Sequence, residues 1–153
     1  MISGNRHNAL GLFIFFMMLL SSHAAQGAVQ DTRTNMSPVT SALQKLVDES
    51  PSADRTSEAS SLAIRLRQDH ASISDYDVSL LSRLVLDSDE SMRFWAAVMI
   101  GNIGPRARSA IPALEKSLAE RPCENKAMTS ASAVRLALEK LGERYSGPKC
   151  SDK

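Results

Sequence analysis

The sequence is poor in aromatic residues and cysteine and carries almost no net charge. Only 5% of its 153 residues are aromatic, and 18 basic against 17 acidic side chains leave a formal charge of +1. Proteins that bind nucleic acid or an anionic membrane need a basic surplus, which this chain lacks. Two cysteines are too few for a small fold built on many disulfides, and 43% hydrophobic residues are too many for a disordered chain.

The N-terminal segment, up to Ala28, has the layout of a secretory signal peptide. Arg6 precedes the apolar run Ala9–Leu20, and small and polar residues follow. A helix over that run would span about 18 Å, short of the roughly 30 Å hydrocarbon core of a membrane. The favoured cleavage follows Ala24, so residues 1–24 would be the signal peptide, with later sites up to residue 28 left open. We expect a secreted or periplasmic protein without stable membrane insertion after cleavage.

The chain that remains after residue 24 has the composition of a helical protein. Its basic and acidic residues balance, and many of its hydrophobic residues are Ala and Leu. Residues 25–36 are polar and aperiodic and are interpreted as a flexible leader. From residue 37 to residue 142, apolar residues recur at helical spacing between stop signals made of Ser, Asp, Gly and Pro. This composition suits sheets poorly, so the predicted fold class is all-α.

The apolar stripes fall into three helix pairs with a regular spacing. The interval from Leu43 to Leu81 equals the interval from Ile103 to Leu141, and the interval from Leu81 to Leu114 is slightly shorter. All three intervals lie in the thirties, a helix-turn-helix period typical of an α-solenoid, in which each pair covers the apolar stripe of the next. We therefore expect a short α-α superhelix of about three helix pairs. The six helices are predicted at residues 38–48, 56–69, 75–85, 90–103, 111–118 and 129–141.

The central stretch Leu84–Leu118 contains a specific combination of short motifs. They are Asp87-x-Asp89, Met92-Arg93, Ala96-Ala97, Ile100-Gly101, Ile103-Gly104-Pro105 and Ala110-Ile111-Pro112-Ala113-Leu114. With these residues the stretch resembles a bacterial HEAT repeat of the type related to the phycobilin-lyase repeats, whereas the outer pairs match only by spacing and apolar pattern. The resemblance implies a superhelix that holds other proteins. Some relatives are enzymes, so it does not settle activity.

One stripe of the fourth helix is the candidate binding surface. Phe94, Val98 and Asn102 are spaced i, i+4 and i+8, and Trp95 lies at the edge of their stripe. In the resembling family the positions of Phe94 and Val98 usually hold polar residues, and the second helices of the pairs line the concave inner surface. We expect these four residues to bind a protein partner. The alternative is that Phe94 and Trp95 are simply part of the core.

Five residues are interpreted as structural caps. Ser37 and Ser74 precede helical stripes and are predicted N-caps. In HEAT-like repeats an Asp such as Asp87 or Asp89 caps the helix, and an Arg such as Arg93 hydrogen-bonds across the turn or to the neighbouring repeat. An acid–base or metal pair is the functional alternative for this group.

The cysteines Cys123 and Cys150 are expected to form a disulfide. Export places them in an oxidising compartment, where an isolated pair usually becomes oxidised. The tail, residues 143–153, is long enough to fold back beside the last helix and close the bridge. A redox or nucleophilic thiol is the alternative.

The sequence offers no grouping of residues typical of an enzyme. His70 is the single histidine beyond the signal peptide, and together with two oxidised cysteines it cannot form a zinc site. We expect a non-catalytic scaffold without cofactor or metal that binds a protein, and no nucleic acid, through its second helices. A structural or folding-assistance module of the cell envelope, with self-association open, is the main alternative, and a lyase-like enzyme is the weaker one.

Overall fold

Within the residues that the structure describes, the chain is all-helical. The computed structural model describes residues 36–69, 72–121 and 129–145. By its contacts the chain divides into Met1–Met36 and Ser37–Lys153, and the description concerns the second unit. Its helices are α2 (Pro38–Asp48), α3 (Ala53–Gln68), α4 (Asp75–Leu84), α5 (Glu90–Ile103), the 3-10 helix η3 (Gly104–Ala110), α6 (Ile111–Glu120) and α7 (Ser130–Lys140).

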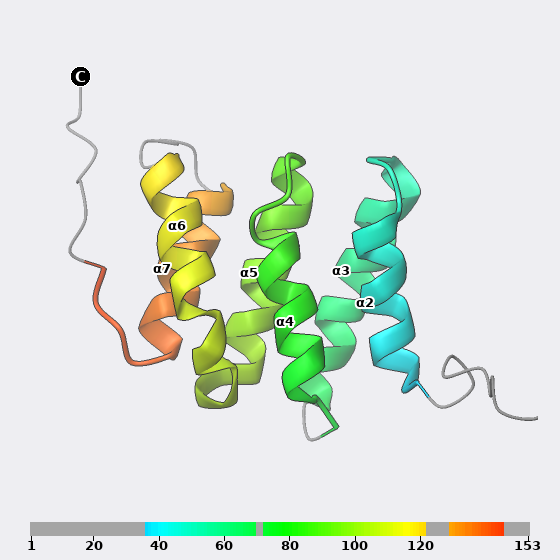
Figure 1. The fold of residues 1–153 in the computed structure, drawn as a ribbon, viewed down its shortest axis with the longest axis horizontal. Helices are drawn as coiled ribbons and strands as arrows, with labels where there is room; N and C mark the ends of the chain where they lie inside the picture. The colour runs from blue at the N-terminus through cyan, green and yellow to red at the C-terminus, as the bar shows by residue number, and fades with distance from the viewer. Residues whose placement is uncertain (1–35, 70–71, 122–128, 146–153) are drawn as a thin grey trace, which may run out of the picture. The chain divides into compact units, whose positions relative to one another are not determined.

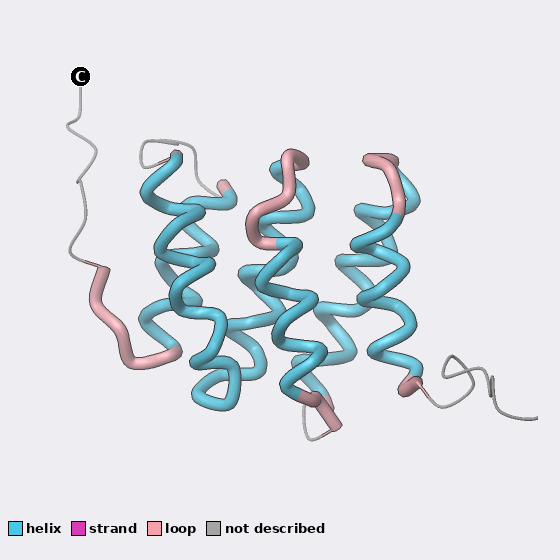
Figure 2. The backbone as a smooth tube through the Cα atoms, in the orientation of Figure 1, coloured by secondary structure: helices cyan, strands magenta, loops and turns pink. Residues whose placement is uncertain are grey.

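The helices of this unit lie in two layers (Figure 1). Helices α2, α4 and α6 form one layer, and α3, α5 and α7, the second helices of the three pairs, form the other. Helix α5 contacts both α3 and α7, whereas α4 contacts α2 and α6. Figure 2 shows the connecting loops at the ends of the helices, so the outer faces of both layers are made of helix surface.

Helices α2, α3, α4, α5 and α7 begin at polar side chains that accept from one of their first backbone N–H groups. The Ser37 hydroxyl accepts from the Thr40 N–H at 3.0 Å, and Ser74 forms a capping box with Asp77. The Asp89 carboxylate accepts from the Ser91 N–H at 2.8 Å. The starts of α2, α4 and α5 therefore agree with the sequence prediction. Helix α3 begins earlier than predicted, at Ala53, because the hydroxyl of Ser52 caps it.

The core lies between the two layers and is mostly aliphatic. Each fully buried Leu, Ile or Met contributes about 1.5–3 kcal/mol relative to an exposed one. Helix α5 is buried along most of its length because it has neighbours on both sides in its own layer and a partner layer behind it. The largest fully buried apolar side chains are Leu43, Leu46, Leu62, Leu66, Leu80, Leu81, Leu84, Met92, Met99, Ile100 and Leu114.

Two glycines set the geometry at the end of α5. Gly104 has φ 68° and ψ −144°, a conformation that favours glycine, and its N–H donates to the Ile100 carbonyl. The helix ends there, as the sequence predicts, but the 3-10 helix that follows was not foreseen. At Gly101 an added Cβ would lie 3.3 Å from Lys140 Cδ and 3.4 Å from Ala137 Cα. Helices α5 and α7 therefore approach each other closely at this glycine.

Several predicted features lie outside the described residues. They are the signal peptide 1–24, the leader up to residue 35, Cys123, Cys150 and the tail beyond residue 145. In the described start of the tail, Arg108 Nη2 donates to Glu143 Oε1 at 2.7 Å, and Tyr145 packs against the core. None of the helices in the described ranges has the length and apolar character needed to cross a membrane.

Candidate protein-binding surface

The predicted binding residues lie on α5, in the middle of the layer of second helices, and none of them is fully exposed. Phe94, Trp95, Val98 and Asn102 are all half-buried. The rings of Phe94 and Trp95 meet edge to face, with centroids 5.1 Å apart and an interplanar angle of 84°. Both rings pack against the core and also keep some solvent-accessible surface. They are therefore neither the exposed anchors nor the fully buried core residues that the two sequence interpretations describe.

Asn102 has a structural contact that the sequence did not predict. Its Nδ2 donates to the carbonyl oxygen of Ala63 in α3 at 3.1 Å. This bond joins two neighbouring helices of the layer, so part of the hydrogen-bonding capacity of the side chain is already used within the protein. The geometry gives Asn102 a role in holding α3 against α5.

The most exposed aliphatic side chains of the layer flank α5 on both sides. Ile64 in α3 is 53% exposed and Leu136 in α7 is 52% exposed. Leu136 follows Val98 by the same interval that separates Leu43 from Leu81, and Ile64 precedes Asn102 by that interval too. Both therefore stand at the same sequence interval from a residue of the α5 stripe. This spacing makes both residues predictable from the sequence, although the expected stripe was confined to α5.

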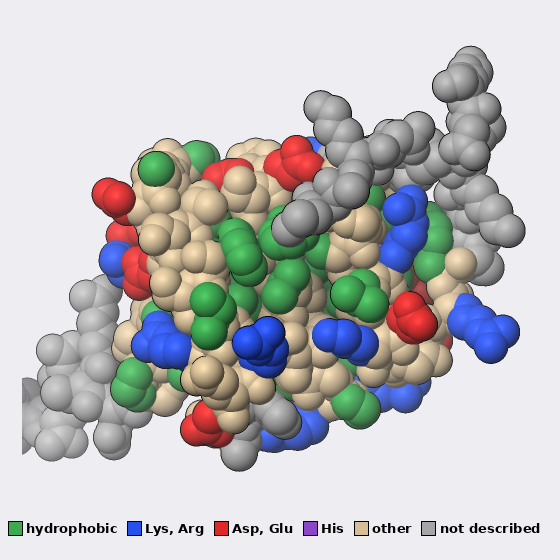
Figure 3. Space-filling model, turned by 180° about the vertical axis from the view of Figure 1, so that it is seen from behind, with side chains coloured by type: hydrophobic (Ala, Val, Ile, Leu, Met, Phe, Trp, Pro, Cys, Tyr) green, Lys and Arg blue, Asp and Glu red, His purple; other side chains and the backbone are tan. Residues whose placement is uncertain are grey.

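Together these side chains give the layer an apolar face, which we name the second-helix patch. Figure 3 views the protein from this side and shows hydrophobic side chains gathered across the middle of the face, with Lys and Arg side chains beside them. Isolated surface leucines are common, whereas apolar side chains that gather on one face favour a binding surface. The patch consists of Ile64, Phe94, Trp95, Val98 and Leu136.

Two hollows border the patch. A notch of about 40 Å³ lies between α5 and α7, and a shallower hollow of about 300 Å³ is lined by Glu90, Ser91, Phe94 and Trp95. The small residues in the floor of the notch let the two helices approach, so that Val98 and Leu136 form its rim. The notch is lined by Ala97, Val98, Gly101, Ala133, Leu136, Ala137 and Lys140.

A buried arginine, Arg55, fixes the first pair of helices to the second. Its side chain is 1% exposed, and its Nε and Nη2 donate to the Leu46 carbonyl at 2.8 and 2.5 Å. Nη2 also pairs with Asp87 Oδ2 at 2.7 Å. Arg93 follows Arg55 by the interval that separates Leu43 from Leu81, and its Nη1 donates to the carbonyls of Asp87 and Ser88 at 2.9 and 2.8 Å. Both arginines therefore satisfy carbonyls at or beyond the end of the preceding helix, which favours the structural interpretation of Asp87 and Arg93.

The groups around Asp87 change the pKa of its carboxyl. Partial burial acts to raise its pKa. The hydrogen bonds from Arg55 and from the Asp89 backbone, together with the charges of Arg55 and Arg93, outweigh that effect and hold the pKa below its usual value of 3.8. The ionised Asp87 carboxylate therefore acts as a structural contact between α3 and the loop before α5.

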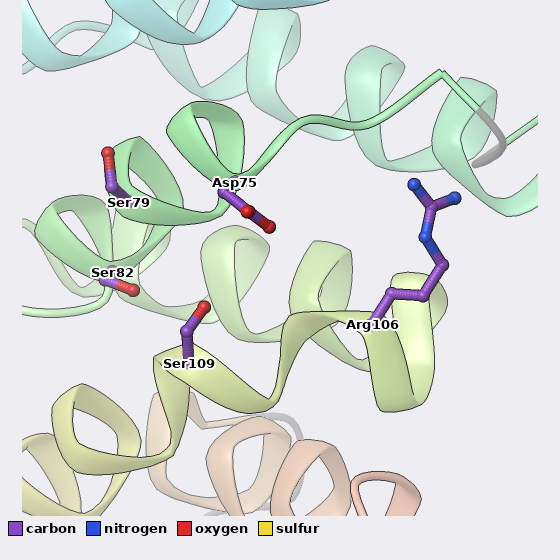
Figure 4. A pocket seen from close by; sticks show the side chains of 5 residues that line it. All are labelled: Asp75, Ser79, Ser82, Arg106 and Ser109. Carbon is purple, nitrogen blue, oxygen red and sulfur yellow. The ribbon is translucent and has the colours of Figure 1, made fainter.

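A further hollow, polar in character, lies between α4 and η3 (Figure 4). It measures about 530 Å³ and is lined by Asp75, Ser79, Ser82, Arg106 and Ser109. The Ser79 and Ser82 hydroxyls donate to the Tyr76 and Val78 carbonyls at 2.7 and 2.9 Å, and Arg106 donates to the Ile73 carbonyl at 2.8 Å. Figure 4 shows the Arg106 guanidinium away from the serine hydroxyls. The Ser79 and Ser82 hydroxyls are therefore engaged with backbone carbonyls of α4.

Among the residues described, no group of three or more His, Cys, Asp or Glu side chains could hold a metal ion. Comparison of the chain with protein-family models, curated proteins and solved structures gives no match.

Proposed function

We propose that this chain is an exported, non-catalytic scaffold that binds a protein partner through the second-helix patch. In this proposal the three helix pairs form a short α-α superhelix of the HEAT type. The observation that carries the proposal is the row formed by Ile64, Val98 and Leu136, one apolar side chain on each of three neighbouring helices. Export rests on the signal-like sequence of residues 1–24.

The exposure of Ile64, Val98 and Leu136 to water is unfavourable in free energy, and a bound partner would remove it. Two of these aliphatic side chains are more than half exposed, and covering such surface contributes about 25 cal/mol per Å². The half-buried rings of Phe94 and Trp95 extend the patch and are held rigid by the core, which lowers the entropy cost of binding. Asn102 joins α5 to α3, and Arg55 joins α3 to the loop before α5, so this part of the patch is preorganised.

The proposal includes neither cofactor nor chemical step. The sequence contains one histidine beyond residue 24, and the polar hollow beside α4 shows hydroxyls bonded to backbone carbonyls. The disulfide between Cys123 and Cys150 stays part of the proposal, and the mass of the unreduced mature protein tests it.

Affinity capture with matched variants tests the function. The double variant Ile64→Gln, Leu136→Gln removes the exposed apolar groups while it keeps helix propensity and charge nearly unchanged. Tyr76→Gln is the control, because Tyr76 is equally exposed, at 53%, but lies on α4 in the other layer. We expect the wild type and Tyr76→Gln to retain a partner from envelope extracts of the producing cells, and the double variant to lose it.

Two outcomes would count against a scaffold for another protein. If the double variant captures the same partner as the wild type, the second-helix patch is not the binding surface. If light scattering shows that the wild type is a stable oligomer and the double variant a monomer, the patch serves self-association instead.

A further inference from the structure

Basic side chains lie beside the second-helix patch, near the C-terminal ends of α3 and α7. The segments 64–68, 98–103 and 135–140 contain Arg65, Arg67, Arg135 and Lys140, against one acid, Glu139. Arg65, Arg67 and Lys140 are exposed at the surface. Figure 3 shows Lys and Arg side chains spread along this face next to the hydrophobic ones. The local surplus contrasts with the whole sequence, in which 18 basic and 17 acidic residues nearly cancel.

A notch between α5 and α7 lies beside these basic side chains. Its floor is made by Gly101, Ala133 and Ala137, and Leu136 forms part of its rim. Lys140 also lines the notch, and its Cδ would lie 3.3 Å from a Cβ at Gly101, so its stem runs over the close contact between α5 and α7. A hollow of this size suits one aliphatic side chain, with a cation at its edge.

We propose that the segment bound by the second-helix patch is an acidic amphipathic helix. Its apolar stripe would cover Val98 and the neighbouring exposed residues, with one aliphatic side chain in the notch. Its flanking carboxylates would pair with Lys140 on one side and Arg65 on the other. This inference rests on the proposed function and adds the chemical class of the partner.

The observations favour a helix over the other occupants. Apolar anchors at i, i+3, i+4 and i+7 with charged flanks are how an amphipathic helix occupies a groove. Helices α3, α5 and α7 present a ridged surface with apolar rows, into which the ridge of another helix fits. A membrane surface is disfavoured because the chain as a whole is close to neutral.

Binding of designed peptides tests this inference directly. The acidic probe is a helix-forming peptide of about 18 residues with a Leu stripe and Glu on both flanks, and the basic probe has Lys in place of Glu. The sequence has a single tryptophan. Trp95 lies at the patch, so its fluorescence reports binding to the full mature chain. Vesicles of phosphatidylglycerol serve as a third probe.

We expect the acidic peptide to bind about 10-fold or more tightly than the basic one, with a preference that weakens as salt increases. Arg65→Glu with Lys140→Glu should abolish or reverse the preference. Lys116→Glu on α6 should leave it unchanged and is the control. Basic residues near helix ends also favour the helix dipole, so circular dichroism must show that each variant stays folded.

Equal binding of both peptides, or binding of neither, would overturn the acidic-helix inference. Binding to the vesicles that competes with the peptide would also overturn it and would identify a lipid surface. The capture experiment with Ile64→Gln and Leu136→Gln then separates the two proposals. If the partner is still lost in that variant, the patch binds a protein of another chemistry, and if it is retained, the proposed function fails as well.

Discussion

Arg55 and Asp87 form an ion pair of 2.7 Å that joins α3 of the first helix pair to the loop before α5 of the second. Arg55 is almost completely buried, and the same guanidinium group also satisfies the Leu46 carbonyl. Arg93 then bonds to the backbone of the same loop. The loop between α4 and α5 is therefore held from both sides, and it fixes the distance between two of the helices that carry the patch.

Replacing Arg55 should strongly destabilise the fold. In Arg55→Ala the Leu46 carbonyl loses the buried guanidinium that donates to it, and Asp87 loses its ion-pair partner while it keeps the hydrogen bond from the Asp89 N–H. We expect a loss of about 2–4 kcal/mol in the free energy of unfolding, measured by chemical denaturation. Lys45→Ala is the control, because Lys45 pairs with Glu58 at 2.6 Å but is 54% exposed. An equal loss in both variants would contradict the structural role of Arg55.

The low pKa of Asp87 predicts a loss of stability in acid. Because the pKa is lower in the folded state than its usual 3.8, ionised Asp87 stabilises the fold above that value. The stabilisation disappears as the pH falls through the folded-state pKa. The free energy of unfolding should therefore decrease below about pH 4 in the wild type, and less steeply in Asp87→Asn. Glu115→Gln, which removes an exposed carboxyl on α6, should keep the wild-type slope.

The turn at the end of α5 should not tolerate a side chain. Gly104 has a positive φ of 68°, and Gly104→Ala should lower the free energy of unfolding by about 1–3 kcal/mol through backbone strain. An added Cβ there would meet no atom within 4 Å, so crowding cannot cause the loss. If thermal unfolding of Gly104→Ala matches that of the wild type, the turn relaxes without cost and this description of the helix end is wrong.

Much of the fold could be predicted because its signals are local. Ser37, Ser74 and Asp89 each mark a helix start within a few residues of the N–H groups that they cap. The apolar stripes at helical spacing indicated the all-helical fold for the same reason. The sequence did not predict η3, because Pro105 after Gly104 is typical of a helix end. The chain instead continues as a 3-10 helix directly into α6.

The details of the binding surface depend on distant residues and could not be predicted in the same way. The exposure of Phe94 and Val98 is decided by α3 and α7, which come from other parts of the chain. The burial of Arg55 depends on Asp87, which lies in the next helix pair. Ile64 and Leu136 could have been predicted, since the same sequence interval relates them to Asn102 and Val98.

Site-specific photo-crosslinking at Leu136 is the most direct test of the second-helix patch. A photoreactive phenylalanine analogue at position 136 keeps an apolar side chain there, and the same analogue at position 76 places one of similar exposure on the other layer. We predict a discrete adduct with a partner protein from position 136 and none from position 76. Equal labelling from both positions, or labelling from position 76 alone, would contradict the proposal that this face binds the partner.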